Sequence, residues 1–188
     1  MKDVVCFIQA RTNSTRLPGK IWLPIQGETL LDRAYRQASQ IFGERATVVV
    51  GVVTDERLVE WIGQRETQPN AFAWAGNEND VLSRFWHAAK ECELAPDTLI
   101  ARWTPDDWRK NPEYVRDAVR GWQWPVEQSV EVFTVAQLDE WYWSVPPARR
   151  EHIGHLMPPR GIHPPDDGLP WSIDTQADYD AVISAVGA

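Results

Sequence analysis

The chain has 188 residues, of which 43% are hydrophobic, and its 27 acidic and 19 basic side chains give a net charge of −8. This length suits one sizeable core, so we expect a single domain over residues 1–188, and the acidic balance argues against a protein that binds nucleic-acid polymers. Two cysteines exclude a disulfide framework, and without a secretory leader or an apolar run of about 18 residues we expect a cytoplasmic protein that does not span a membrane.

The first predicted element is a buried strand over Val4–Ile8, an apolar run rich in β-branched residues. It leads into a polar loop that carries Arg11, Arg16 and Lys20 and contains no acidic residue. In an acidic chain, such a positive patch at the end of a strand indicates an anionic ligand, most simply a polyphosphate. Ser14 adds a hydroxyl donor to the loop. A solvated basic loop without a ligand is the alternative.

Strand and helix patterns then alternate along the chain. A helix is expected after Gly27, followed by a strand over 46–53 that is apolar throughout and by a helix that Thr54 and Asp55 begin. A weaker strand over 71–74 and a helix from Asp80 to about Glu91 follow. Alternation of this kind predicts a mostly parallel sheet in a three-layer αβα fold of the Rossmann-like type.

The next predicted strand, over 98–103, ends just before Asp106 and Asp107. In open α/β sheets ligands lie outside the carboxyl ends of the strands. We therefore expect this acidic pair and the basic loop of residues 11–20 to meet in one crevice. On the residues alone, Asp106 is also consistent with an ordinary turn aspartate.

Residues 120–170 form an irregular segment rich in proline and tryptophan, which we interpret as an acceptor-side wall or a flap. Within it we expect a short strand over 130–133 and a helix that Thr134 caps. Residues 158–170 are predicted to be an ordered loop. A last strand over 169–173 should then precede a terminal helix that Asp174 caps.

Four stretches resemble the cytidylyltransferases that make CMP-activated sugars. They are Gln9 to Lys20 (QARTNSTRLPGK), Gly76 to Arg84 (GNENDVLSR), Arg102 to Asp106 (RWTPD), and Ser172 to Thr175 (SIDT). The spore-coat-polysaccharide branch is the most similar, with the CMP-Kdo and CMP-sialic acid synthetases further off. The resemblance implies the nucleotide-diphospho-sugar transferase fold, which is GT-A-like, with the first stretch wrapped around the triphosphate of CTP.

The resemblance also implies roles for particular residues. Mg²⁺ would be held by Asp106 and Asp174, and catalysis would rest on Asp106 with Arg11, Arg16 and Lys20. The substrates would be CTP and a sugar or sugar-acid acceptor, and a homodimer is compatible with the family. Acceptor binding would fall to Glu131 and His152, the latter in the segment Arg-Glu-His that the family shares. Nucleotide binding would fall to Gln9, Ala10, Arg11, Ser14, Arg16, Lys20 and Arg84.

Plainer interpretations stand beside these roles. Asp174 is also consistent with a helix cap, and Arg84 with a surface helix charge. Solvated surface positions are the alternative for Glu131 and His152. A histidine metal cluster of His152, His155 and His163 is a further hypothesis, although an irregular region gives it no defined ligand geometry.

The chain departs from the family pattern beside Asp106. Pro105 replaces the usual glycine, and Asp107 and Trp108 replace a small Cys-Pro pair. Asp107 would then join the metal site or repel phosphate, and the ring of Trp108 would lie where a substrate belongs. Two other functions therefore compete with CMP transfer: a GT-A-type glycosyltransferase, and a catalytically degenerate relative that binds a nucleotide or a protein partner.

Overall fold

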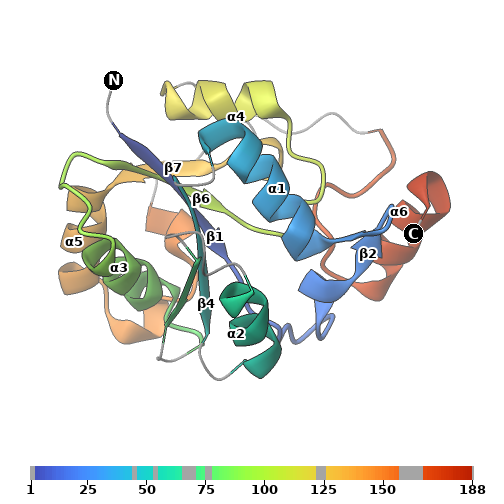
Figure 1. Cartoon of the computed structure of the whole chain (residues 1–188), viewed down its shortest axis with the longest axis horizontal. Helices are drawn as coiled ribbons and strands as arrows, with labels where there is room; N and C mark the ends of the chain where they lie inside the picture. The colour runs from blue at the N-terminus through green and yellow to red at the C-terminus, as the bar shows by residue number, and fades with distance from the viewer. Residues whose placement is uncertain are drawn as a thin grey trace.

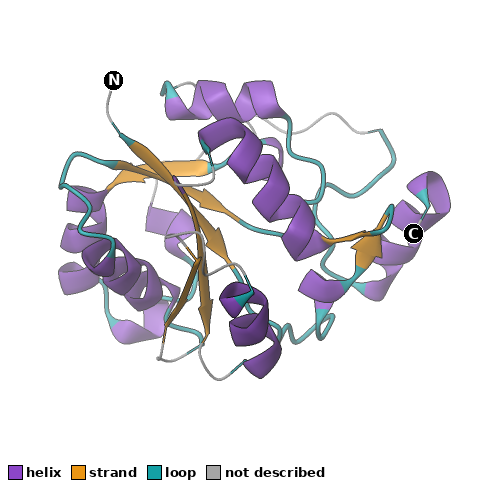
Figure 2. Cartoon of the chain, viewed as in Figure 1, coloured by secondary structure: helices purple, strands orange, loops and turns teal. Residues whose placement is uncertain are grey.

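The body of the protein is a five-stranded sheet with helices on both faces (Figures 1 and 2), as described by a computed structural model. The structure describes residues 3–43, 46–52, 55–64, 71–74, 78–121, 126–156 and 167–187. Both faces of the sheet are covered, which explains why the chain is apolar at successive positions over 4–8 and 48–52 rather than at alternate ones.

The sheet is mostly parallel, as predicted. It consists of β1 (Val4–Gln9), β4 (Thr47–Val52), β5 (Ala71–Trp74), β6 (Leu99–Trp103) and β7 (Glu131–Thr134). The strand order is β5-β4-β1-β6-β7, in which β7 is antiparallel to β6 and the other pairs are parallel. A separate two-stranded hairpin is formed by β2 (Pro24–Ile25) and β3 (Glu28–Thr29).

The α-helices begin where side chains cap them. They are α1 (Leu30–Phe42), α2 (Glu56–Gly63), α3 (Val81–Glu91), α4 (Pro112–Val119), α5 (Val135–Ser144) and α6 (Gln176–Val186). Asp55 and Thr134 accept hydrogen bonds from backbone N–H groups at the starts of α2 and α5, as predicted. Thr54 lies outside the described residues. None of the described helices has the length and apolarity that crossing a membrane requires.

Two large apolar clusters define the layers. One joins α1, α2 and α4 to the face of β1 that carries Cys6 and Ile8, and the other joins α3 and α5 to the face that carries Phe7. Alternate residues of β1 therefore enter different cores, as the period of a strand requires. The predicted αβα arrangement is confirmed.

A third, smaller core lies beside the sheet. It packs α6 against the β2–β3 hairpin, on the right in Figure 1, with Leu17, Trp108 and Ile173 at its centre. These three residues come from the loop after β1, the turn after β6 and the segment before α6. Since these are the segments that carry the predicted site residues, this core positions them relative to one another.

One prediction for the last third of the chain needs correction. Residues 169–173 form no strand; instead a backbone hydrogen bond joins Ile173 N–H to the carbonyl of Asp106 at 2.9 Å. The strand and the helix expected within the segment over 120–170 are present as β7 and α5, which complete the sheet and its second helical layer. Residues 157–166, which make up most of the predicted loop, lie outside the described residues.

We expect Gly51→Ala to lower the free energy of unfolding by about 1–3 kcal/mol, because a buried strand has no room for an added methyl group. A Cβ atom at Gly51 in β4 would lie 2.7 Å from Leu58 Cδ2 of α2. Gly63→Ala is the matched control, since a Cβ atom at Gly63 would meet nothing within 4 Å. This variant should raise the free energy of unfolding by roughly 0.4–1 kcal/mol. Urea unfolding measures both variants. Equal stability of Gly51→Ala and the unmodified protein would contradict the packing described.

Candidate functional site

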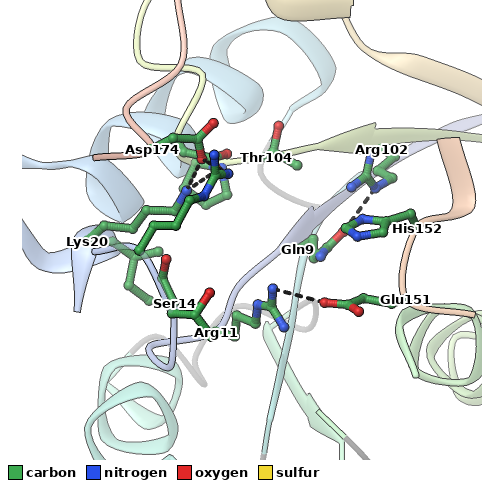
Figure 3. A pocket seen from close by; sticks show the side chains of 14 residues that line it. Gln9, Arg11, Ser14, Lys20, Arg102, Thr104, Glu151, His152 and Asp174 are labelled. Atoms are coloured by element: carbon green, nitrogen blue, oxygen red, sulfur yellow. Dashed lines mark hydrogen bonds and ion pairs between the residues drawn. The ribbon is translucent and has the colours of Figure 1, made fainter. Parts of the chain in front are cut away.

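A cavity of about 330 Å³ opens at the carboxyl ends of the central strand β1 and its neighbour β6 (Figure 3). Its position agrees with the crevice that the strand pattern predicts. The lining combines the basic loop, the turn after β6, and two later segments of the chain. The residues that line it are Gln9, Arg11, Ser14, Thr15, Arg16, Lys20, Ile21, Arg102, Thr104, Pro105, Asp106, Glu151, His152 and Asp174.

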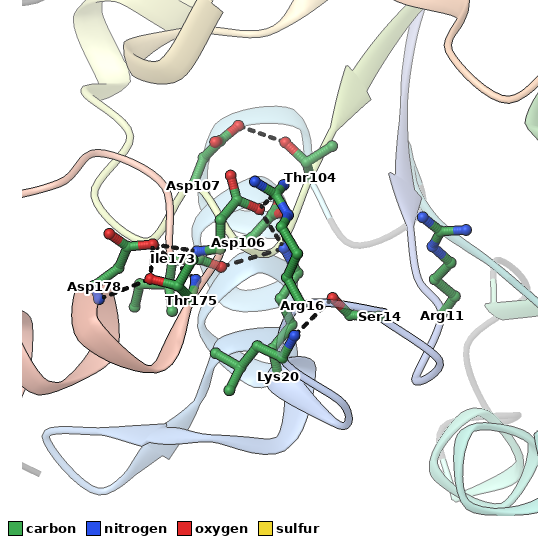
Figure 4. Close-up of polar contacts among 12 residues, drawn as sticks. Arg11, Ser14, Arg16, Lys20, Thr104, Asp106, Asp107, Ile173, Thr175 and Asp178 are labelled. Atoms are coloured by element: carbon green, nitrogen blue, oxygen red, sulfur yellow. Dashed lines mark hydrogen bonds and ion pairs between the residues drawn. The ribbon is translucent and has the colours of Figure 1, made fainter.

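The basic loop is closed into a compact ring by its own backbone. Gly19 N–H donates to the carbonyl of Thr12 at 2.8 Å, and Leu17 buries its side chain in the third core. Gly19 has φ +71°, a left-handed conformation that a glycine adopts at little cost. The next residue, Lys20, opens a short 3₁₀ helix, lines the cavity, and directs its ammonium group toward Asp106 (Figure 4).

Lys20 lies between the two carboxylates that the sequence nominates for a metal. Its Nζ is 2.5 Å from Asp106 Oδ2 and 2.9 Å from Asp174 Oδ1, and it also donates to the carbonyl of Ile173 at 3.2 Å. Burial by itself lowers the pKa of Lys20, but the charges and hydrogen bonds of the two aspartates outweigh burial and raise it. Lys20 is therefore an ammonium ion at neutral pH. Arg16 pairs with Asp174 at 2.9 Å from the solvent side.

Asp174 does not cap the terminal helix, contrary to the prediction. Thr175 is the cap, and the side chain of Asp178 reaches back to its backbone N–H to complete a capping box. Asp178 also accepts a hydrogen bond from the backbone N–H of Asp174. The shift by one residue leaves the Asp174 carboxylate free to face the cavity rather than the helix.

The far side of the cavity is built around Arg11 and Arg102. Arg11 donates to Asn79 Oδ1 at 3.1 Å and pairs with Glu151 at 3.4 Å. Gln9 Oε1 accepts from Arg102 Nε at 2.9 Å. His152 lines the cavity on this side, close to Gln9 and Arg102 in Figure 3. This side of the cavity therefore contains cations and hydrogen-bonding groups that can bind a polar substrate.

Six lining residues were not singled out as site residues from the sequence: Thr15, Ile21, Arg102, Thr104, Pro105 and Glu151. Arg102, Thr104 and Pro105 precede Asp106 within the matching stretch RWTPD, and Glu151 precedes His152 in the Arg-Glu-His segment. Each lies within or directly beside a stretch that carries a predicted site residue. The sequence therefore indicated which stretches form the cavity, but it did not indicate which of their side chains point into it.

Arg84 and Glu131 do not line the cavity, contrary to the prediction. Arg84 is fully buried, and it donates to the carbonyls of Ala10 and Glu78 at 3.3 Å each. Burial, together with the nearby charge of Arg11, lowers the pKa of Arg84 to about 10. The surface position proposed as the alternative for Arg84 is also wrong. Arg84 instead supports the start of the basic loop through its hydrogen bond to the carbonyl of Ala10.

Glu131 lies at the start of β7, where the antiparallel register places it opposite Arg102 of β6. The two side chains form a nearly buried ion pair. Gly154 packs directly on this carboxylate, since a Cβ atom there would lie 2.3 Å from Glu131 Oε1. The surface position considered for Glu131 is therefore wrong as well. The ion pair with Arg102, which lines the cavity, connects Glu131 to the site.

Of the three unusual residues beside Asp106, Pro105 lines the cavity, whereas Asp107 and Trp108 turn away from it. Asp107 is buried, accepts a hydrogen bond from Thr104 and forms an ion pair with Lys110 at 2.7 Å. Burial raises the pKa of Asp107, although the charge of Lys110 opposes the shift. Trp108 packs in the third core and donates its Nε1–H to the carbonyl of Pro170 at 2.8 Å. Neither Asp107 nor Trp108 lines the cavity.

The pair Asp106 and Asp174 suits a hard divalent cation. Mg²⁺ usually takes one or two carboxylates and completes its shell with water and substrate phosphates. The described residues contain no group of three or more His, Cys, Asp or Glu side chains that could hold a metal by themselves. Of the hypothetical histidine cluster, His163 and the side chain of His155 lie outside the described part of the chain.

Comparisons with known proteins point in one direction. A family model described as cytidylyltransferase matches residues 5–108, more than half of the chain. The spore coat polysaccharide biosynthesis protein SpsF of Bacillus subtilis is 31% identical over 115 residues, covering 60% of this chain and 47% of SpsF. The 3-deoxy-manno-octulosonate cytidylyltransferase of Chromohalobacter salexigens is 30% identical over 123 residues, covering 64% of this chain and 45% of that protein. The chain thus spans about half the length of the curated relatives it matches.

A solved structure extends the likeness over nearly the whole chain. The cytidylyltransferase of Leptospira borgpetersenii serovar Hardjo-bovis superposes with a TM-score of 0.75 at 23% identity. The match covers 95% of this chain and 84% of that protein. At this identity the likeness shows the fold, and it confirms the predicted nucleotide-diphospho-sugar transferase architecture.

We expect Lys110→Met to lower the free energy of unfolding by about 3–5 kcal/mol at pH 8, because it leaves the buried Asp107 carboxylate without its cation. Without Lys110 the pKa of Asp107 rises further above its unfolded value. The native state then binds the extra proton as pH falls, so the loss should shrink toward pH 5. Lys90→Met is the matched control, since Lys90 and Asp139 form an exposed pair worth roughly 0–1 kcal/mol. Equal losses of unfolding free energy in the two variants would contradict a buried, stabilising ion pair between Asp107 and Lys110.

Proposed function

Because the chain belongs to the cytidylyltransferase family, as its motifs predicted, we propose that it transfers CMP from CTP to a sugar or sugar acid and releases pyrophosphate. One observation carries the proposal. Lys20 and Arg16 meet Asp106 and Asp174 on one wall of the cavity, so phosphate-binding cations and metal-binding carboxylates lie side by side. The names of the two curated relatives support the substrate class, since one is a sugar-acid cytidylyltransferase and the other serves polysaccharide synthesis.

The proposed reaction is an in-line displacement at the α-phosphorus of CTP. An acceptor hydroxyl oxygen forms a bond to this phosphorus, the bond from the phosphorus to the bridging oxygen of the β-phosphate breaks, and the hydroxyl proton is lost to solvent. Lys20 and Arg16 are placed to hold the β- and γ-phosphates and to stabilise the departing pyrophosphate charge. Arg11, further along the loop wall, would hold the α-phosphate.

Asp106 and Asp174 would hold Mg²⁺, which when bound neutralises phosphate charge and lowers the pKa of a coordinated acceptor hydroxyl. Both carboxylates line the cavity, and the backbone hydrogen bond from Ile173 N–H to the carbonyl of Asp106 ties the two segments that carry them. The acceptor would bind on the other side, against Gln9, Arg102 and His152. Glu131 would act there as a positioning residue, through its ion pair with Arg102.

The two competing functions fare differently. A GT-A-type glycosyltransferase is not favoured, because Asp107 is committed to Lys110 and cannot join Asp106 at a shared metal. A non-catalytic relative that binds nucleotide or a protein is the alternative to test, although the cations and carboxylates predicted to take part, apart from Arg84 and Glu131, line the cavity. A homodimer and a cytoplasmic location stay predictions.

The test is a release assay for pyrophosphate with CTP, UTP, ATP and GTP, each with Mg²⁺ and a panel of sugars and sugar acids. We expect CTP to be preferred and Asp106→Asn to lower the rate on the order of a hundredfold or more, as the loss of a group that stabilises transition-state charge does. Asp180→Asn is the matched control, because Asp180 is an exposed carboxylate on α6 outside the cavity.

Thermal unfolding in the same nucleotides separates binding from catalysis. A ligand present at about 100 times its dissociation constant stabilises the native state by about 2.7 kcal/mol. Stabilisation by CTP without pyrophosphate release from any acceptor would favour the non-catalytic alternative. The proposed function is overturned if CTP does not stabilise the protein and no pyrophosphate is released from CTP with any acceptor.

A further inference from the structure

The ammonium group of Lys20 already sits where a cation belongs. Three oxygen atoms surround Nζ within 3.2 Å, from Asp106, Asp174 and the backbone of Ile173. Two of these are the carboxylate oxygens that the proposed function assigns to Mg²⁺. The side chain of Lys20 is only 12% exposed, so solvent screens its charge poorly.

A divalent cation and the Lys20 ammonium cannot share this position. Mg²⁺ requires oxygen ligands at about 2.0–2.1 Å, whereas both carboxylates are engaged by a nitrogen that carries a positive charge. Bringing a second cation to the same two oxygen atoms places like charges a few ångströms apart in a partly buried site. One of the two cations has to leave.

A triphosphate offers Lys20 another partner. Lysine carries a point charge on a flexible stem with four carbons, and phosphate oxygens are among its strongest acceptors. Arg16, which holds Asp174 from the solvent side, can make the same exchange. Both side chains line the cavity, so neither has to cross the protein to reach a bound nucleotide.

We propose that Lys20 is an exchangeable internal cation, which excludes a divalent metal from Asp106 and Asp174 until a nucleotide triphosphate draws it away. This inference rests on the proposed function for the identity of the nucleotide. Its consequence is positive coupling: nucleotide raises the affinity for metal, and metal raises the affinity for nucleotide by the same factor. Metal alone binds weakly, so the site assembles only when the substrate is present.

The test measures Mn²⁺ binding by the loss of the free-ion electron paramagnetic resonance signal, with Mn²⁺ standing in for Mg²⁺ on oxygen ligands. Without nucleotide, Lys20→Met should bind Mn²⁺ at least tenfold more tightly than the unmodified protein, and Lys20→Met with Asp106→Asn should lose this gain. Lys90→Met is the matched control, because Lys90 pairs with Asp139 outside the cavity, and it should leave Mn²⁺ binding unchanged. Circular dichroism confirms that each variant is folded.

A second measurement needs no variant. Calorimetric titration of the unmodified protein with CTP, with and without Mn²⁺, should show at least a tenfold higher CTP affinity when the metal is present. The inference is overturned if folded Lys20→Met gains no Mn²⁺ affinity, or if CTP binds equally well with and without metal.

The outcomes separate this inference from the proposed function. If the unmodified protein binds CTP and releases pyrophosphate, but Lys20→Met gains no Mn²⁺ affinity, the proposed function is supported and the exchange of Lys20 for the metal is overturned. A gain of Mn²⁺ affinity in Lys20→Met without CTP binding to the unmodified protein would support competition for the carboxylates and overturn the proposed function.

Discussion

The ion-pair cluster around Lys20 is the interaction on which the site depends. It ties the loop after β1 to the turn after β6 and to the segment before α6, which are far apart in the sequence. The third core fastens the same three segments through Leu17, Trp108 and Ile173. A charged cluster alone would leave the loop free to move. With the apolar anchor beside it, the loop presents its cations in one direction.

The turn that carries Asp106 departs from the motif that the resemblance implies, and Asp106 still lines the cavity. Asp107 and Trp108 replace two small residues, yet each has found a partner outside the cavity, in Lys110 and in the carbonyl of Pro170. A buried ion pair costs desolvation that its own attraction only partly offsets, so its value here lies in fixing one conformation of the turn. Asp107 and Trp108 therefore hold the turn that carries Asp106 through partners outside the cavity.

The sequence predicts the fold and most of the cavity well, because strand runs, helix periods and the polar loop are local patterns. It fails where the answer depends on distant partners. Arg84 shares its helix with apolar residues, but only the tertiary structure shows that its guanidinium bonds to the backbone of Ala10. Glu131 meets Arg102 because β7 adds antiparallel to β6. The cap of α6 is misassigned by one residue: Asp174 and Thr175 are both good caps, and the capping box that Asp178 forms with Thr175 decides between them.

The most direct test of this account is a crystal structure of the protein with CTP and Mn²⁺, in which anomalous scattering locates the metal. We predict the triphosphate in contact with Lys20 and Arg16, and an anomalous peak bound by both Asp106 and Asp174. In that complex Lys20 should no longer contact either carboxylate. A nucleotide bound elsewhere, or one bound in the cavity while Lys20 keeps both aspartates, would contradict the central claim.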